Sequence, residues 1–307
     1  MTEEIKCRLN LPMSDEYIYR LSDRKEGEPF PIVSDVMFHT MLNNESRKQY
    51  VSYLLSLLIG KDKKEIEENI IFVKNKLDKQ NYHDSSKTVD LVCELEDEIY
   101  NIEMNNNTTS IEALERNIDY IHSLYKSKMK RGNKYQYQKC IQINLNNFSF
   151  QGDNNTIEVY QLRDEAGIPL TEKITIIYIY LPNIRKKLYN KDKLTDLERL
   201  LLVFNEGSSD CLDNLIGEDP VMSEYVNDAL DASEDEEIIG LYDKELHQEM
   251  LRNTELYHAE EKGLEEGKKT EKIEIAKAML KEDEPLEKIS KYTGLSIEEI
   301  NKISENL

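Results

Sequence analysis

Residues 87–105, KTVDLVCELEDEIYNIEMN, decide the fold of this chain. Apolar and polar residues alternate on both sides of the polar pair Glu96 and Asp97, a pattern typical of two strands joined by a tight turn. If Glu96 and Asp97 form a two-residue turn, residue i faces residue 193 − i, so Asp90 faces Glu103. Directly opposed residues have Cβ atoms ~5 Å apart. The hairpin therefore predicts two carboxylates that are close enough to share one divalent ion.

The segments around this hairpin alternate between helical and strand patterns. Helices are predicted over residues 35–43, with Ser34 as the N-cap, over 45–58, ended by Gly60, and over 110–130. Strands are predicted over 70–73, 88–95, 99–105, 140–145, 157–162 and 174–181, and a polar connection over 74–86. We expect an α/β fold with a mixed central sheet of four or five strands, helices on both faces, and an α-helical C-terminal region.

The spacing of Asp90, Glu103 and Asn105 suits a specific chemistry. Cleaving a phosphodiester requires a water nucleophile, stabilisation of a charged transition state and neutralisation of the leaving oxygen, all of which a divalent ion can supply. Mg²⁺ prefers hard oxygen ligands, commonly one or two carboxylates together with water and substrate phosphate. The alternative interpretation is a solvated sheet face that carries a charge cluster, since this short pattern also arises by chance.

Several segments, in order, resemble the recombination-promoting nuclease and transposase (Rpn-like) branch of the PD-(D/E)XK nuclease superfamily. The resemblance covers residues 30–185, and residues 286–300 at the end of the chain are also similar to that family. The similar segments are 35–38 (DVMF), 57–60 (LLIG), 89–91 (VDL), 100–105 (YNIEMN), 116–125 with Arg116, Tyr120 and Tyr125, 130–135 (KRGNKY) and 140–145.

This resemblance implies roles for individual residues. Asp90 and Glu103 would bind Mg²⁺ or Mn²⁺, and Asn105 would stand at the position that orients the attacking water. Asp35 would hold a metal-bound water or a second metal, or it would simply stabilise the positive end of its helix. Arg116 would bind substrate phosphate or form a salt bridge with a neighbouring carboxylate.

Two residues depart from the family pattern. Asn105 replaces the usual Lys or Gln after the Glu-Met pair, and His39 replaces the usual Lys of the first helix. Both changes leave the carboxylates intact, so we expect metal binding to survive while turnover is low or lost.

The charge of the chain is unevenly distributed. The net charge is −21, of which residues 1–185 carry −5 (24 Lys and Arg, 29 Asp and Glu) and residues 186–307 carry −16 (16 and 32). The second part would repel nucleic acid, whereas the first could contact a phosphate backbone through a basic patch or a metal ion. We predict three regions: a nuclease-like domain over 1–185, an acidic helical region over 186–265, and a helical hairpin over 266–307.

The remaining features concern location and association. The four cysteines are scattered and form no CxxC pair, and the longest apolar runs, 50–59 and 174–181, are far below the ~20 residues of a spanning helix. We expect a cytoplasmic protein with free thiols and no membrane contact. Residues 260–268 are predicted to be a charged linker. The final hairpin has four Lys against seven acidic residues over 281–307, so we expect packing or homo-oligomer formation there rather than DNA contact.

Three functional hypotheses follow. The first, implied by the resemblance, is a Mg²⁺-dependent DNA endonuclease that acts in recombination or mobile-element biology. The second is a catalytically weak or inactive relative that serves as a binding module, as Asn105 and the net charge suggest. The third is a hydrolase on the same fold that acts on RNA or nucleotides.

Overall fold

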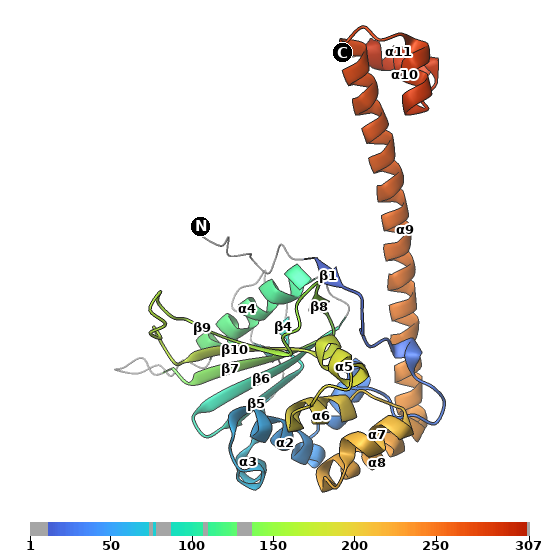
Figure 1. Ribbon diagram of the computed structural model, residues 1–307. Coiled ribbons are helices and arrows are strands. Elements are labelled where there is room, and N and C mark those ends of the chain that lie inside the picture. Colours follow the sequence, from blue (N-terminus) through green and yellow to red (C-terminus); the bar gives the residue numbers. More distant parts are fainter. Residues whose placement is uncertain (1–11, 74–75, 78–86, 107–109, 128–136, 306–307) are drawn as a thin grey trace. The chain divides into compact units, whose positions relative to one another are not determined.

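The computed structural model describes residues 12–73, 76–77, 87–106, 110–127 and 137–305. Its centre is a mixed sheet of six strands in the order β2-β5-β6-β7-β10-β9, which confirms the α/β fold with more strands than expected (Figure 1). Strands β6, β7 and β10 run parallel, and each outer pair is antiparallel. The strands are β2 (Ile71–Val73), β5 (Leu91–Leu95), β6 (Glu98–Asn105), β7 (Lys139–Asn146), β9 (Ile157–Gln161) and β10 (Ile174–Tyr180).

The predicted hairpin has the predicted register. Leu91 pairs with Ile102 and Leu95 with Glu98, each pair summing to 193, and Glu96 in the turn has a φ of 56°. The first strand is shorter than predicted, because the chain leaves the ladder at Asp90. Before that point, β4 (Lys87–Thr88) pairs separately with β3 (Lys76–Leu77). The rest of the predicted connection over 74–86 lies outside the described residues.

One face of the sheet is covered by α4 (Ser110–Ser127) (Figure 1). Ile121 and Leu124 of this helix pack with Val92, Ile99 and Cys140 in a buried apolar cluster. Side chains alternate along a strand, so every second residue of β6 and β7 lies on this face. These residues are apolar at the start of the two strands and polar toward their ends. The register sets Glu103 beside Asn144, and Asn105 beside Asn146.

The opposite face is covered by helices, some of which precede the strands of the sheet in the sequence and some of which follow them (Figure 1). Tyr50, Leu54 and Leu55 of α2 are buried, as are Ile102 and Ile143 of the strands. Helix α2 ends at Gly60, which has a φ of 71°, as predicted. The helices of this layer are α2 (Lys48–Ile59), α3 (Lys63–Asn69), α5 (Leu181–Tyr189), α6 (Asp196–Val203), α7 (Ser209–Ile216) and α8 (Pro220–Glu234).

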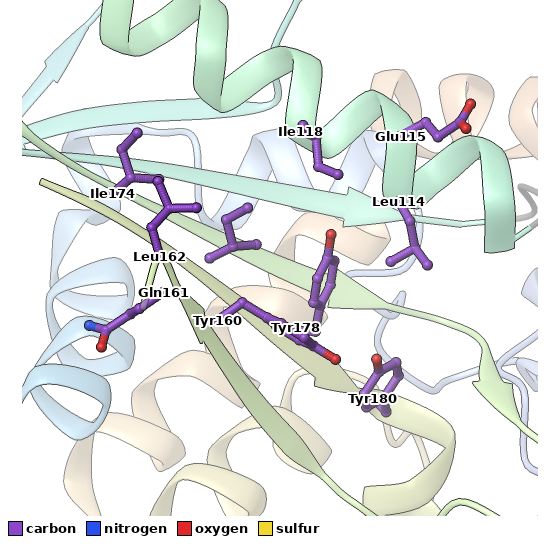
Figure 2. A pocket seen from close by; sticks show the side chains of 10 residues that line it. Leu114, Glu115, Ile118, Tyr160, Gln161, Leu162, Ile174, Tyr178 and Tyr180 are labelled. Carbon is purple, nitrogen blue, oxygen red and sulfur yellow. The ribbon is translucent and has the colours of Figure 1, made fainter. Parts of the chain in front are cut away.

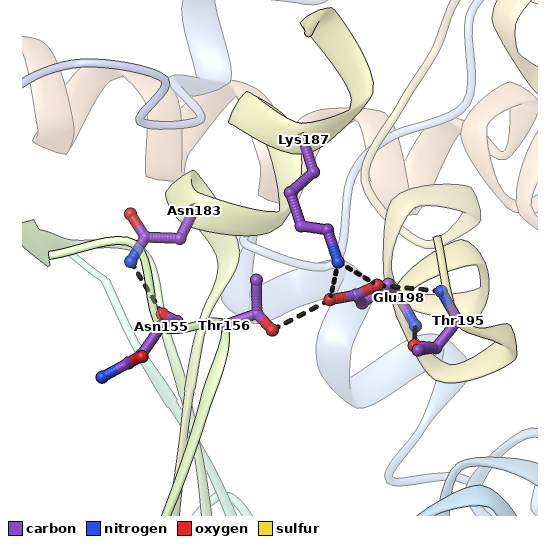
Figure 3. Close-up of polar contacts among 6 residues, drawn as sticks. All are labelled: Asn155, Thr156, Asn183, Lys187, Thr195 and Glu198. Carbon is purple, nitrogen blue, oxygen red and sulfur yellow. Dashed lines mark hydrogen bonds and ion pairs between the residues drawn. The ribbon is translucent and has the colours of Figure 1, made fainter. Parts of the chain in front are cut away.

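A buried carboxylate ties α5, α6 and the start of β9 together (Figure 3). Lys187 donates to both oxygens of Glu198 at 2.8 Å, and Thr156 donates to one of them at 2.9 Å. The backbone N–H of Thr195 donates to the other at 2.8 Å and completes a capping box at the start of α6. Burial raises the pKa of Glu198, but these hydrogen bonds outweigh it and leave that pKa below its usual value.

The chain folds into two compact units, residues 1–245 and 246–307. The sequence-based division at residues 185 and 265 stays a prediction. Smaller elements of the first unit are the ribbon of β1 (Met13–Ser14) with β8 (Ser149–Phe150), and the 3-10 turns η2 (Leu21–Asp23) and η3 (Glu45–Arg47).

The predicted linker over 260–268 is wrong, because these residues belong to α9 (Glu236–Lys281). Strong helix formers dominate this stretch, and Lys262 pairs with Glu266 one turn later at 3.9 Å. The end of α9 packs through Ala276 against α10 (Leu286–Thr293) and α11 (Ile297–Ser304). Within the described ranges, none of the helices is long and apolar enough to cross a membrane.

Candidate active site

Asp90 and Glu103 meet at the end of the hairpin, where Asp90 has left the strand. The departure of Asp90 leaves the backbone N–H of Met104 free of the ladder, and the Asp90 carboxylate accepts a hydrogen bond from it at 2.8 Å. The backbone N–H of Asp90 in turn donates to Glu103 Oε1 at 3.4 Å. Asn43, just after helix α1 (Asp35–Met41), donates from its amide to the Asp90 carbonyl at 2.8 Å. The backbone N–H and carbonyl of Asp90 are thus both hydrogen-bonded to side chains, and the N–H bond is to Glu103 itself.

The two carboxylates disfavour each other's ionised forms. Burial raises the pKa of Glu103, which is only 2% exposed, and the charge of Asp90 raises it further, to about 8. Burial also raises the pKa of Asp90; the Met104 N–H lowers it, and the carboxylate of Asp35 raises it again. Two neighbouring carboxylates whose pKa values are both raised are stabilised in their ionised form by a bound cation.

Helix α1 (Asp35–Met41) brings Asp35 and His39 to the same region. Ser34 caps this helix as predicted, accepting from the Met37 N–H at 3.3 Å. Asp35 is exposed and acts on Asp90 through its charge, while His39 partly offsets that charge. Glu245, at the end of the first unit, fastens the start of α1 by accepting from the Asp35 N–H at 2.8 Å.

Asn105 is engaged on both sides of its amide. Its carbonyl oxygen accepts from Arg116 Nη2 at 2.8 Å, and its amide nitrogen donates to Asn146 Oδ1 at 2.8 Å. Asn105 is fully buried, so both of its polar groups hold neighbouring side chains. The charge of Arg116 lowers the pKa of both Asp90 and Glu103. The network therefore holds one guanidinium, contributed by α4, close to the two carboxylates.

Further buried amides extend this network along β6 and β7. Gln142 donates to Asn144 at 3.0 Å, and Asn144 donates to the carbonyl of Ile177 at 3.2 Å. Asn101 lies close enough to Glu103 to lower its pKa. In the part of the chain that the structure describes, Gln142 Oε1 and Asn146 Nδ2 find no hydrogen-bond partner. Polar groups this deeply buried suit a site that binds a polar ligand or water.

The carboxylates of this site suit an ion such as Mg²⁺, which keeps several water ligands, better than an ion whose ligands all come from the protein. Among the described residues, no three Asp, Glu, His or Cys side chains gather closely enough to cage a metal. Mg²⁺ commonly takes only one or two protein carboxylates and completes its shell with water and substrate phosphate. The buried Glu103 and the half-buried Asp90 provide these two carboxylates.

An apolar groove of about 430 Å³ lies on the other side of α4, between that helix and strands β9 and β10 (Figure 2). Leu114 and Ile118 of α4 face Tyr160, Ile176 and Tyr178 across it. Neither Asp90 nor Glu103 lines this groove, so we regard it as separate from the carboxylate site.

Of the predicted site residues, Asp90 and Glu103 are in direct contact, and Asn105 is joined to Arg116. Asp35 acts on Asp90 through its charge only. The sequence patterns did not indicate Asn43, Asn146 or Glu245, which reach the site from other elements. One feature of the sequence does point to Asn146: it is a polar residue on the side of a buried strand that faces the protein interior.

Comparison with known families gives one match. A family model described as PD-(D/E)XK nuclease family transposase matches residues 32–259. No curated protein and no solved structure matches the chain.

Proposed function

Because the chain belongs to the PD-(D/E)XK nuclease family of transposases, we propose that it is a metal-dependent DNA endonuclease with its site at Asp90 and Glu103. The observation that carries this proposal is the contact of the half-buried Asp90 with the buried Glu103, whose pKa the charge of Asp90 raises. Three-quarters of the chain falls within the family match, including every residue assigned a role below.

Asp90 and Glu103 would hold a Mg²⁺ or Mn²⁺ ion through their carboxylate oxygens. When bound, such an ion activates water and stabilises the charge that develops on the phosphate. Asp90 is oriented for this task by the Met104 N–H and by Asn43, and Glu103 accepts a hydrogen bond from the Asp90 N–H. Asp35, at the exposed start of α1, would bind water on the substrate side of the pair.

Arg116 would carry the positive charge that a lysine usually contributes at the Asn105 position. The lysine of the family motif projects from the strand, whereas Arg116 projects from α4 and is held against the strand by Asn105. A guanidinium is always charged and presents several donors to phosphate oxygens. In this proposal Asn105 positions Arg116 and does not orient the attacking water, since both its amide groups are already engaged.

The second candidate function is a binding module that retains the metal site but does not cleave. The absence of a lysine at residues 39 and 105 and the net charge of −21 favour it. An activity on RNA is the third candidate, because a metal ion at the carboxylate pair would act on the phosphodiester group that both nucleic acids share.

Cleavage of supercoiled plasmid with Mg²⁺ or Mn²⁺ separates the three candidates, with a folded RNA as a parallel substrate. We expect the wild type to nick plasmid DNA, and Asp90→Asn and Glu103→Gln to lose this activity while keeping their fold. Asp97→Asn, an exposed carboxylate in the turn of the same hairpin, is the matched control and should cut normally. Plasmid left intact by a wild type that still binds metal would favour the binding module, and cleavage of RNA alone the third candidate.

A further inference from the structure

The middle of α9 is a single helix that is exposed on every side. All residues from 250 to 272 are exposed, a run of 23 that includes Gly263 and Gly267. Glycine weakens a helix, and helices in water normally owe their stability to packing of an apolar face. A helix of this length and composition is therefore expected to have a partner in solution.

Apolar residues form a stripe along one side of this helix. Met250, Tyr257 and Leu264 are spaced seven residues apart and are 50%, 63% and 60% exposed. Ile275 follows eleven residues after Leu264, which is three helical turns, and it is 42% exposed. In coiled coils, apolar residues recur at two positions of each seven-residue repeat, and in this helix the repeat is apolar mainly at one of them. Leu251 and Leu256 are also exposed but project from other sides of the helix.

The charges along the helix define how two copies would pair. Residues 252–266 contain two basic and five acidic residues, a net charge of −3, whereas residues 267–281 contain five basic and two acidic residues, a net charge of +3. A parallel pair would place like charges together. An antiparallel pair would place each acidic half against the basic half of the other copy, which attracts.

We propose that the chain forms a homodimer through an antiparallel coiled coil of α9, centred near Glu266 and Gly267. In this arrangement Tyr257 of one copy lies level with Ile275 of the other, since both are about nine residues from the centre. Glu261 similarly lies level with Lys272 of the other copy, which sets an acidic residue against a basic one. The proposal is independent of the nuclease function, because it involves none of the residues of the carboxylate site.

The first test is the mass of the full-length protein in solution by light scattering. We expect twice the 36.0 kDa of one chain for the wild type, and at least a tenfold weaker dimer for Tyr257→Lys and Leu264→Lys. Leu251→Lys and Leu256→Lys are the matched controls, because they introduce the same charge at equally exposed apolar positions outside the stripe. A monomeric wild type at micromolar concentration, or equal dissociation of control and stripe variants, would overturn the proposal.

Disulfide trapping tests the direction of pairing. In a background with Cys7→Ser and Cys211→Ser, the double variant Tyr257→Cys/Ile275→Cys should crosslink two chains, whereas Tyr257→Cys alone should not. In the antiparallel dimer the two copies of residue 257 are separated by about 19 residues along the axis, or ~28 Å. Efficient crosslinking of Tyr257→Cys alone would show parallel helices and contradict the proposed arrangement.

Discussion

Metal binding at the carboxylate pair should depend steeply on pH between 6 and 8. Divalent ions bind the ionised form of a carboxyl group, so the ion must displace the proton of Glu103. Burial and the neighbouring Asp90 raise the pKa of Glu103 to about 8. In this pH range the proton therefore competes with the metal, which it does not do at an ordinary carboxylate.

The magnitude follows from the ionised fraction of Glu103. A group with a pKa of about 8 is ionised to roughly 1% at pH 6 and roughly 50% at pH 8. The apparent affinity for Mn²⁺ should therefore rise about 50-fold over this range, equivalent to about 2.3 kcal/mol. Asp90, whose pKa is also raised, can only steepen this dependence.

Isothermal titration with Mn²⁺ at pH 6, 7 and 8 measures this dependence directly. Repeating it in two buffers of different ionisation enthalpy counts the protons released, which we expect to approach one per ion at pH 6. Glu103→Gln should bind weakly and with a shallower pH dependence than the wild type, and Asp97→Asn should match the wild type. A wild-type affinity that changes less than about threefold between pH 6 and 8 would refute the assigned role of Glu103.

Four further outcomes are expected. Because the pKa of Glu103 is raised on folding, the metal-free wild type loses stability as the pH rises from about 4.5 to about 8. In urea unfolding with a chelator present, Glu103→Gln should therefore be more stable than the wild type by a few kcal/mol at pH 8, and equally stable at pH 4. Glu198, with its lowered pKa, contributes stability above pH 4.5 that is lost as pH falls, and Glu198→Gln should cost about 3 kcal/mol at pH 7 in the same assay, since it strands the Lys187 charge. Arg116→Met should slow single-turnover plasmid nicking about 100-fold, with partial recovery in Arg116→Lys and unchanged Mn²⁺ stoichiometry; equal rates in both variants would show that its charge is not used. Leu54→Ala, at a fully buried position of α2, should cost about 2–5 kcal/mol in urea unfolding.

The hairpin was predictable from the sequence because two strong local signals agree. Alternation with a period of two defines which residues share a face, and a polar two-residue turn then fixes the register. Glu96 takes a left-handed conformation that glycine or asparagine would adopt more readily, so the turn itself gives a weak signal. The register brings Asp90 next to Glu103, although Asp90 itself lies outside the ladder and contacts Glu103 through its backbone N–H.

The surroundings of the site were less predictable, because they depend on contacts between distant segments. Asn43 is 47 residues from Asp90, and Asn146 is 41 residues from Asn105. Local patterns contain no information about such pairs. Asn105 illustrates this: its position in the strand predicts water orientation, but the local pattern does not indicate its hydrogen bonds to Arg116 and Asn146.

Two helices were missed for a different reason. Helix α3 buries only Ile66, so it has no apolar periodicity, and its main signal is the capping side chain of Asp62. The sequence in the middle of α9 predicts a linker, because it is rich in charged residues and glycines and lacks a wide apolar stripe. Periodicity detects helices that pack against the core, and neither segment has an extensive apolar face of this kind.

The most direct test of the account is crystallography of the full chain with Mn²⁺, using anomalous scattering to locate the ion. The account predicts a single strong peak in the first unit, with oxygen atoms of both Asp90 and Glu103 at about 2.0–2.3 Å. A peak elsewhere in that unit, or a site left empty at Mn²⁺ concentrations that saturate binding in solution, would contradict it.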